Sequence, residues 1–281
     1  MQRKSSAAIL AIVLLGTLMW AQGPAEFHPG FNLFSKEQDV QLGKENADQV
    51  RKQKTVIKDP VLTAYVNRVG QRLVSSREAQ ESGFPFTFEV VADPSINAFA
   101  LPGGPMFINT GLLRAVDNEA QLAGVMGHEM SHVILRHGTN QASKSQLIEL
   151  PAILGAQMTG SSMVGKLAQL GIGLGANSVL LKFSRTDESQ ADLMGSHLMA
   201  EAGYDPMQLA RFFEKLNANG GQQAPQFLSD HPNPENREKA IATEVQRLPA
   251  QNYAYQTGDF QRMKQVIAKV HEKPVPPPHA Q

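Results

Sequence analysis

The sequence contains no cysteine among its 281 residues. This absence excludes disulfide bonds, thiolate metal sites, a cysteine nucleophile and a lipid-modified cysteine behind a leader segment. Aromatic residues are also few, at 6% of the chain, and the formal net charge is zero. A chain without excess positive charge gives no electrostatic reason to expect nucleic acid or an anionic membrane surface as a partner.

The composition suits one globular domain, with 42% hydrophobic and 19% charged residues. A chain of this length can bury a core without disulfides or a structural metal. Any metal that the chain binds is therefore expected to serve chemistry rather than folding.

The N-terminal segment is predicted to be a signal peptide. Arg3 and Lys4 form a basic start, Ala7–Met19 is apolar, and Ala21–Gly23 has the small-x-small pattern of a cleavage site. The apolar part is short for a membrane span, and an uncleaved anchor is the alternative. Cleavage near Gly23 removes two positive charges and no negative ones, so the net charge of 0 becomes −2. We expect a periplasmic or secreted bacterial protein.

Helix caps, hydrophobic periodicity and short β-rich runs predict an α+β domain, with many helices around one small sheet. Asp117 is expected to cap the central helix and Gly138 to end it. Residues 140–177 are rich in Gly, Ala, Leu and Met and are interpreted as one or two amphipathic helices near the functional site. The expected strands are 86–91, 98–101 and 106–109, and the expected helices are 36–54, 60–73, 118–137, 178–202 and 206–217.

Three parts are expected along the chain. They are a signal peptide over 1–23, one domain over 24–250 and a C-terminal extension over 251–281. The last part ends in a proline-rich tail that we predict to be disordered.

His128, Glu129 and His132 form the pattern H-E-x-x-H within the predicted helix 118–137. Positions i and i+4 of a helix lie about 40° apart around its axis and about 6 Å along it, so both imidazoles can reach one zinc ion at about 2.0–2.1 Å. Glu129 can then reach a water molecule beside the metal. The alternative is two structural histidines and a solvated glutamate, which the helical context disfavours.

A zinc site with three protein ligands needs one more donor. Glu188 and Asp192 lie at i and i+4 on the predicted helix 178–202, so one face presents both carboxylates. In a zinc site of the glutamate-ligand type, Glu188 binds the metal and Asp192 accepts a hydrogen bond from a ligand histidine. A solvated acidic face paired with Lys182 and Arg185 is the alternative.

With these motifs the chain resembles metallopeptidase family forty-eight, the CAAX-prenyl-protease and HtpX-like gluzincins. Within the family it is most similar to the periplasmic BepA-type branch of β-barrel assembly-enhancing proteases. The resemblance covers about residues 35–248; the membrane spans of some members and the helical repeats of that branch have no counterpart in this sequence. The matching segments are 59–66, 97–104, 110–113, 118–137 and 184–195, together with His231-Pro232 and Arg237.

The resemblance implies a mostly helical, zincin-like metallopeptidase domain with a small sheet beside the active-site helix. It also implies one Zn²⁺ per chain, held by His128, His132 and Glu188. Glu129 is implied as the catalytic base, and Asp192 as an active-site partner that is sometimes assigned as proton donor.

Three further roles rest mainly on this resemblance. His231 is a candidate donor to the developing oxyanion, a candidate zinc ligand in a closed resting state, or a histidine that orders the loop 229–234. Arg237 is expected to brace this loop. An edge strand is expected to hold the substrate main chain, with an ordinary core strand as the alternative; its residues are Asn97, Ala98, Phe99 and Ala100.

The remaining histidines of interest are expected to be structural. His137 is expected to lie off the ligand face of its helix, and we interpret it as a cation or cap in the last helical turn. His28 and His197 are interpreted in the same way, as residues without a part in chemistry.

The predicted function is a secreted or periplasmic zinc endopeptidase that cleaves misfolded or unassembled envelope proteins. The alternative is a zinc-containing, chaperone-like binder of unfolded proteins, suggested by the apolar stretch 147–181, which is also a candidate for peripheral membrane association. A metal hydrolase acting on cell-wall amides is a third reading, disfavoured only by the resemblance.

Overall fold

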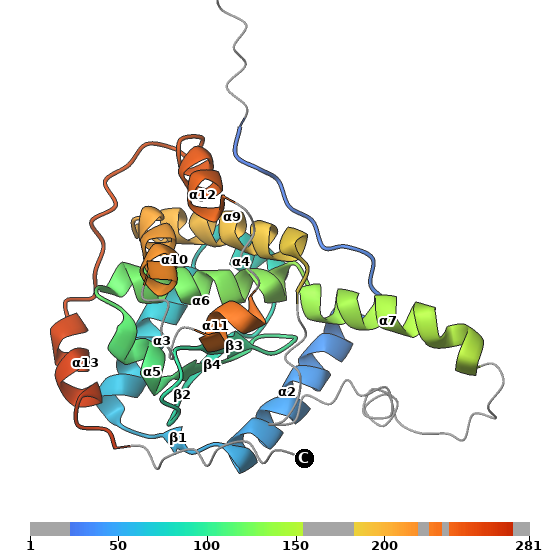
Figure 1. Ribbon diagram of the computed structural model, residues 1–281, viewed down its shortest axis with the longest axis horizontal. Coiled ribbons are helices and arrows are strands. Elements are labelled where there is room, and N and C mark those ends of the chain that lie inside the picture. Colours follow the sequence, from blue (N-terminus) through green and yellow to red (C-terminus); the bar gives the residue numbers. More distant parts are fainter. Residues whose placement is uncertain (1–22, 154–182, 219–224, 232–235, 272–281) are drawn as a thin grey trace, which may run out of the picture.

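The computed structural model describes residues 23–153, 183–218, 225–231 and 236–271 (Figure 1). The predicted α+β class is confirmed, because helices surround one four-stranded sheet. The predicted signal peptide, the proline-rich tail and residues 154–182 lie outside the described residues. Among the described residues, every helix falls short of the length and apolarity needed to cross a membrane.

The sheet has the order β1-β2-β4-β3. Its central pair, β2 (Thr87–Val91) and β4 (Pro105–Asn109), is parallel, while β1 (Val56–Ile57) and β3 (Ala98–Ala100) each pair antiparallel with a neighbour. The predicted strands are therefore present, and β3 forms one edge of the sheet.

The free edge of β3 can be assigned from its hydrogen bonds to β4. Asn97 accepts from Asn109, and Leu101 donates to Pro105. Because bonding alternates along an antiparallel pair, the backbone groups of Ala98 and Ala100 point away from β4. The turn after β3 needs glycine, since Gly103 has φ 76° and packs against the backbone of Val40.

Two early helices begin as predicted. α2 (Lys36–Gln53) starts at Ser35 in a capping box with Gln38, and α3 (Pro60–Val74) starts at Asp59. The apolar face of α3 packs on the sheet, with Leu62, Tyr65, Val66, Val69 and Leu73 fully buried. Two short helices, α4 (Arg77–Ser82) and α5 (Thr110–Ala115), were not predicted.

The central helix differs from its prediction at both ends. α6 (Glu119–Ile134) is capped by Asn118, whose side chain accepts from the Gln121 amide, rather than by Asp117. It ends before Gly138, because Arg136 takes a left-handed conformation with φ 57° and redirects the chain. α7 (His137–Ile153) then begins at once, and it covers the first part of the predicted helical segment 140–177.

α9 (Arg185–Glu201) lies along α6, as Figure 1 shows. A capping box between Ser184 and Asp187 starts it, and Gly203 with φ 81° follows its end. The two helices approach closely where both carry glycine: a Cβ on Gly195 would lie 3.1 Å from the His128 nitrogen and 3.3 Å from the Gly127 carbonyl carbon. The small residues therefore set the spacing of the two helices that carry the metal motifs.

Four helices complete the described chain. They are α10 (Met207–Ala218), α11 (Pro225–Asp230), α12 (Arg237–Val245) and α13 (Phe260–Ile267). α13 packs on α3 and α5 and places Met263 and Ile267 in the main core. Residues of the expected C-terminal extension 251–281 therefore pack on the main core.

Candidate metal centre

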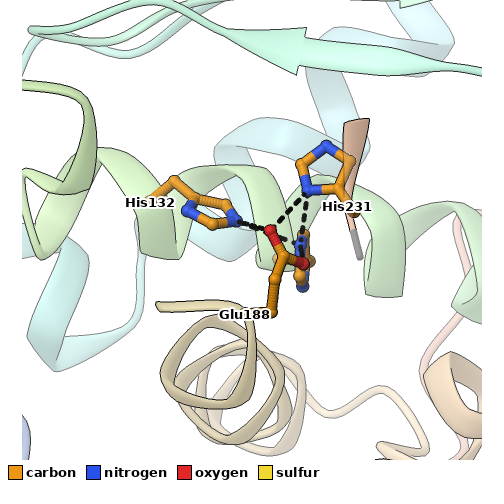
Figure 2. Close-up of side chains that lie close together, drawn as sticks. His132, Glu188 and His231 are labelled. Atoms are coloured by element: carbon orange, nitrogen blue, oxygen red, sulfur yellow. Dashed lines mark hydrogen bonds and ion pairs between the residues drawn. The ribbon is translucent and has the colours of Figure 1, made fainter. Parts of the chain in front are cut away.

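Four buried side chains converge between α6 and α9. His128 and His132 come from one face of α6, Glu188 from the first turns of α9, and His231 from the residue after α11. One ligand atom from each lies within 4.8 Å of all the others. Figure 2 shows the side chains of His132, Glu188 and His231 pointing toward one another.

The spacing of these atoms fits a tetrahedral zinc ion. Bonds of about 2.0–2.1 Å place tetrahedral ligand atoms roughly 3.3 Å apart. His128 Nε2 lies 3.1 Å from His132 Nε2, 3.2 Å from His231 Nδ1 and 3.3 Å from Glu188 Oε2. Glu188 Oε1 lies 3.0 Å from His231 Nδ1 and 3.5 Å from His132 Nε2. These five separations, of which one involves Glu188 Oε2 and two involve Oε1, lie between 3.0 and 3.5 Å, close to the spacing expected around tetrahedral zinc.

The chemistry of the donor set gives a second test. Three ring nitrogens face one point, and His128 Nε2 lies within hydrogen-bond distance of the other two. One hydrogen atom cannot satisfy all three nitrogens, whereas a cation accepts a lone pair from each. The residues present thus fit a divalent metal ion.

Asp192 and Arg237 hold the ligands from behind. Asp192 Oδ1 lies 3.0 Å from His128 Nδ1, which fixes the ring with Nε2 toward the centre. The buried Arg237 guanidinium donates to Asp192 Oδ2 at 2.5 Å and to Glu188 Oε2 at 3.1 Å. Arg237 thus holds the two carboxylates and lies over the Phe213 ring, while residues 232–234 of the loop 229–234 that it was expected to brace lie outside the described residues.

The electrostatics keep Glu188 anionic. Burial opposes ionisation, but hydrogen bonds to His128 and His231 outweigh it and hold the pKa of Glu188 far below its usual range. Burial also disfavours protonated His128, but the hydrogen bonds of His128 to Asp192 and Glu188 outweigh it and raise the pKa of His128 to about 9. In contrast, burial and neighbouring His128 hold the pKa of His132 well below its ordinary value. Metal binding therefore has to displace a proton from His128.

Glu129 faces the centre without serving as one of its ligands. Its Oε2 accepts a hydrogen bond from the Ala100 amide at 3.2 Å, which links α6 to the free edge of β3. Its Oε1 has no hydrogen-bond partner among the described residues, although His231 Nε2 lies 3.2 Å away. Burial raises the pKa of Glu129, against the opposing charges of His231 and His128. A buried carboxylate oxygen beside the metal centre is suited to accept a proton.

His231 occupies the fourth corner of the centre. Its Nδ1 is one of the four donor atoms, and its ring stacks on Phe227 with a centroid distance of 4.6 Å. Of the three roles considered from the sequence, this position matches the ligand of a closed state most directly. The residues that follow, 232–235, lie outside the described part of the chain.

The predicted substrate strand lies beside the centre, although its four residues differ in position. Ala98 and Ala100 present backbone groups at the free edge, whereas Phe99 stacks on Phe107 with a centroid distance of 5.3 Å. Asn97 Nδ2 donates to Asp230 Oδ2 at 3.0 Å, which joins the strand to α11 just before His231.

Two residues beside His132 were not found from the sequence. Phe183 stacks on its ring with a centroid distance of 4.0 Å, and His137 Nδ1 lies 2.9 Å from His132 Nδ1. Helical periodicity placed His137 off the ligand face because it assumed one continuous helix. The left-handed Arg136 turns the chain and brings His137 back over His132.

Comparison with known proteins gives a consistent result. The model of peptidase family M48 matches residues 60–245. The β-barrel assembly-enhancing protease of Escherichia coli strain K12 is 35% identical over 207 residues, which are 71% of this chain and 42% of that protein. The mitochondrial metalloendopeptidase OMA1 of Schizosaccharomyces pombe is 33% identical over 64% of this chain and 52% of its own length. The chain thus spans less than half the length of the first of these relatives.

Proposed function

The chain belongs to peptidase family M48, and we propose that it is a secreted zinc-dependent endopeptidase that cleaves misfolded or unassembled envelope proteins. The observation that carries the proposal is the convergence of His128, His132 and Glu188 on one point with Glu129 beside them. A protein that merely stored or sensed zinc would have no use for a buried carboxylate at that position.

Each residue has a distinct part in the proposed reaction. When bound, zinc supplies a Lewis acid that polarises the scissile carbonyl and makes a water molecule more acidic. His128, His132 and Glu188 hold the ion. Glu129 accepts the proton of the attacking water and passes it to the leaving amine. Asp192 and Arg237 keep His128 and Glu188 in place, so we assign them no proton transfer.

His231 has two positions in the proposal. With Nδ1 at the fourth corner it competes with water and substrate, which describes a resting enzyme. Withdrawn by a short distance, the same ring can donate a hydrogen bond to the oxyanion that develops on the scissile carbonyl. Its position at the end of the short helix α11 makes such a change small.

Substrate is proposed to bind as an added strand along β3. The outward backbone groups of Ala98 and Ala100 are those that an added antiparallel strand would pair with, and among them the Ala100 amide already donates to Glu129 Oε2. If the amide pairs with substrate instead, Glu129 loses that hydrogen bond, so substrate binding at Ala100 also frees the Glu129 carboxylate. A cavity of about 30 Å³ beside His132 and Ala100 offers room for a small group of the bound chain.

The proposed location and substrate class follow from the N-terminal segment and from the name of a relative. The basic and apolar N-terminal segment has the pattern of an export signal. A relative carries the name β-barrel assembly-enhancing protease, which favours β-barrel proteins as substrates. Unfolded chains suit a site at a sheet edge, because an extended backbone is what such an edge recognises.

The Glu129→Gln variant tests the proposal. The amide cannot accept the proton, so cleavage of casein or an unfolded β-barrel protein should fall about 10²–10⁴-fold. Bound zinc, measured by elemental analysis, should stay at the wild-type level. Unchanged cleavage in this variant would remove the proposed mechanism.

A zinc-containing binder with little proteolysis remains the second candidate. His231 at the fourth corner favours it, because a saturated metal site has no position for water. The same experiment separates the two: a binder would hold unfolded protein without cleavage in both the wild type and the Glu129→Gln variant. Cleavage by the wild type alone favours the peptidase.

A further inference from the structure

His132 is held from behind by a second imidazole rather than by a carboxylate. His132 Nδ1 lies 2.9 Å from His137 Nδ1, and His137 Nε2 lies 3.1 Å from Gln190 Oε1. Both rings are buried, so bulk water does not compete for these atoms. The other ligand histidine differs, because the partner of His128 Nδ1 is the Asp192 carboxylate.

The hydrogen atoms along this chain of contacts can be assigned in only one way. For His132 Nε2 to offer a lone pair to a metal, the ring must be neutral with its hydrogen on Nδ1. Two Nδ1 atoms 2.9 Å apart share one hydrogen, so His137 Nδ1 accepts. His137 then carries its own hydrogen on Nε2 and donates it to the Gln190 amide oxygen.

The opposite assignment fails at the metal centre. If His137 carried its hydrogen on Nδ1, it would donate to His132 Nδ1. His132 would then carry its hydrogen on Nε2, directed at His128 Nε2 only 3.1 Å away and at the other donor atoms. That arrangement would close the corner of the centre that His132 supplies.

We propose that His137 is a positioning residue that fixes His132 in its metal-binding tautomer, with Gln190 fixing His137 in turn. The inference rests on the proposed zinc binding at the same centre. It assigns a role to a residue that sequence periodicity placed off the ligand face.

The arrangement also distributes charge. Glu188, Asp192 and Glu129 already bring carboxylates to the centre, and Arg237 pairs with the first two. The direct partner of His137 Nε2 is the neutral Gln190 amide oxygen at 3.1 Å, while the Asp187 carboxylate lies further away, at 3.9 Å. α9 thus supports both ligand rings, through Asp192 for His128 and through Gln190 and His137 for His132.

Two substitutions of His137 separate hydrogen bonding from packing. In His137→Asn, Oδ1 stands two bonds from Cβ, as Nδ1 does in histidine, and still accepts from His132. In His137→Phe, the ring space is filled and the acceptor is lost. Zinc affinity, measured by competition with a chelator, should fall about 10–100-fold in His137→Phe. It should stay within about fivefold of wild type in His137→Asn, because the acceptor remains.

The tautomers can be observed without any variant. In zinc-loaded wild-type protein with ¹⁵N-labelled histidine, NMR should report His137 as the neutral Nε2–H form and His132 as the Nδ1–H form. His137 in the Nδ1–H form would overturn the inference. Gln190→Leu provides a further check. Its loss of zinc affinity should be smaller than that of His137→Phe, because Gln190 is one hydrogen bond further from the metal than His137.

The outcomes distinguish this inference from the proposed function. A wild type that binds no zinc would remove the zinc site itself. A wild type that binds zinc and cleaves, with equal affinity in His137→Phe, would overturn only the role of His137. Thermal unfolding of the metal-free variants identifies a loss of affinity caused by misfolding, and the tautomer measurement then decides.

Discussion

Two clusters of histidine and glutamate lie along α9, and only one of them is built to hold a metal. At the first, Glu188 meets His128, His132 and His231 around one point. At the second, His197 Nε2 lies 2.7 Å from Glu244 Oε1, while its Nδ1 lies 3.9 Å from Glu78. The residue types are the same, but the second cluster places its carboxylates on opposite sides of one ring.

The difference shows what makes a metal site. Lone pairs must converge, and each ligand ring needs a partner on its far nitrogen. At His197 both nitrogens face carboxylates, so the ring holds protons rather than offering a lone pair. The second cluster joins α9 to α12, and Glu244 also accepts from the Ala25 amide at 2.6 Å. Its role is to fasten the N-terminal segment and α12 to the domain.

Replacing His128 and His197 with alanine, one at a time, tests this comparison and has the largest expected effect. His128→Ala removes one of the donor atoms and should weaken zinc binding on the order of 100-fold or more, given about 10–16 kcal/mol shared by four ligands. His197→Ala should leave zinc affinity near wild type. Chelator competition on both variants measures the contrast, and an equal loss in the two would erase the distinction drawn between the clusters.

Asp192→Asn should produce the next largest effect. The amide still reaches His128 Nδ1 but no longer carries the charge that binds Arg237 Nε. Zinc affinity or the rate of cleavage should fall about 10-fold, which is the low end of the range seen when residues that hydrogen-bond a metal ligand are replaced. Glu78→Gln, in the second cluster, is the matched control and should change neither quantity.

Gly195→Ala tests the helix contact that lies between the two clusters. A Cβ there would stand 3.1 Å from the His128 nitrogen, so α9 has to move away from α6. We expect a loss of about 1–3 kcal/mol in the free energy of unfolding, together with weaker zinc binding. Denaturant unfolding measures the first, and competition with a chelator measures the second.

Much of the metal centre could be predicted from the sequence because it depends on positions within single helices. His128 and His132 on α6, and Glu188 and Asp192 on α9, follow from i and i+4 spacing, and the capping box at Ser35 marks a helix start. These signals are local, so no tertiary information was needed. The capping box at Ser184 was not recognised, and the helix was expected from residue 178.

The remainder depends on tertiary contacts that the sequence does not encode locally. The left-handed Arg136 is stabilised by Asp39 and the Phe34 carbonyl, both distant in sequence, so the turn that brings His137 to His132 left no local pattern. Arg237 likewise reaches two carboxylates on another helix. Short helices such as α13 are fixed mainly by packing.

The smallest expected effect is the pH dependence of the second cluster. Burial disfavours protonated His197, but Glu78 and Glu244 outweigh it and raise the pKa of His197. The ion pairs of His197 therefore stabilise the fold fully below about pH 6.5, and their contribution is lost as pH rises through the folded pKa. The pKa of Glu78 is lowered to about 2, chiefly by His197, so stability also falls as pH drops below about 4.5. Between these limits His197→Gln should melt a few degrees below wild type, on the order of 2–4 °C. A constant difference at all pH values would contradict the assignment.

X-ray absorption spectroscopy on zinc-loaded wild-type protein beside Glu188→Ala tests the central claim most directly. The account predicts a tetrahedral shell of nitrogen and oxygen at about 2.0–2.1 Å with imidazole scattering in the wild type, and much reduced zinc content in the variant. Full zinc content in Glu188→Ala, or a wild-type shell without imidazoles, would contradict it.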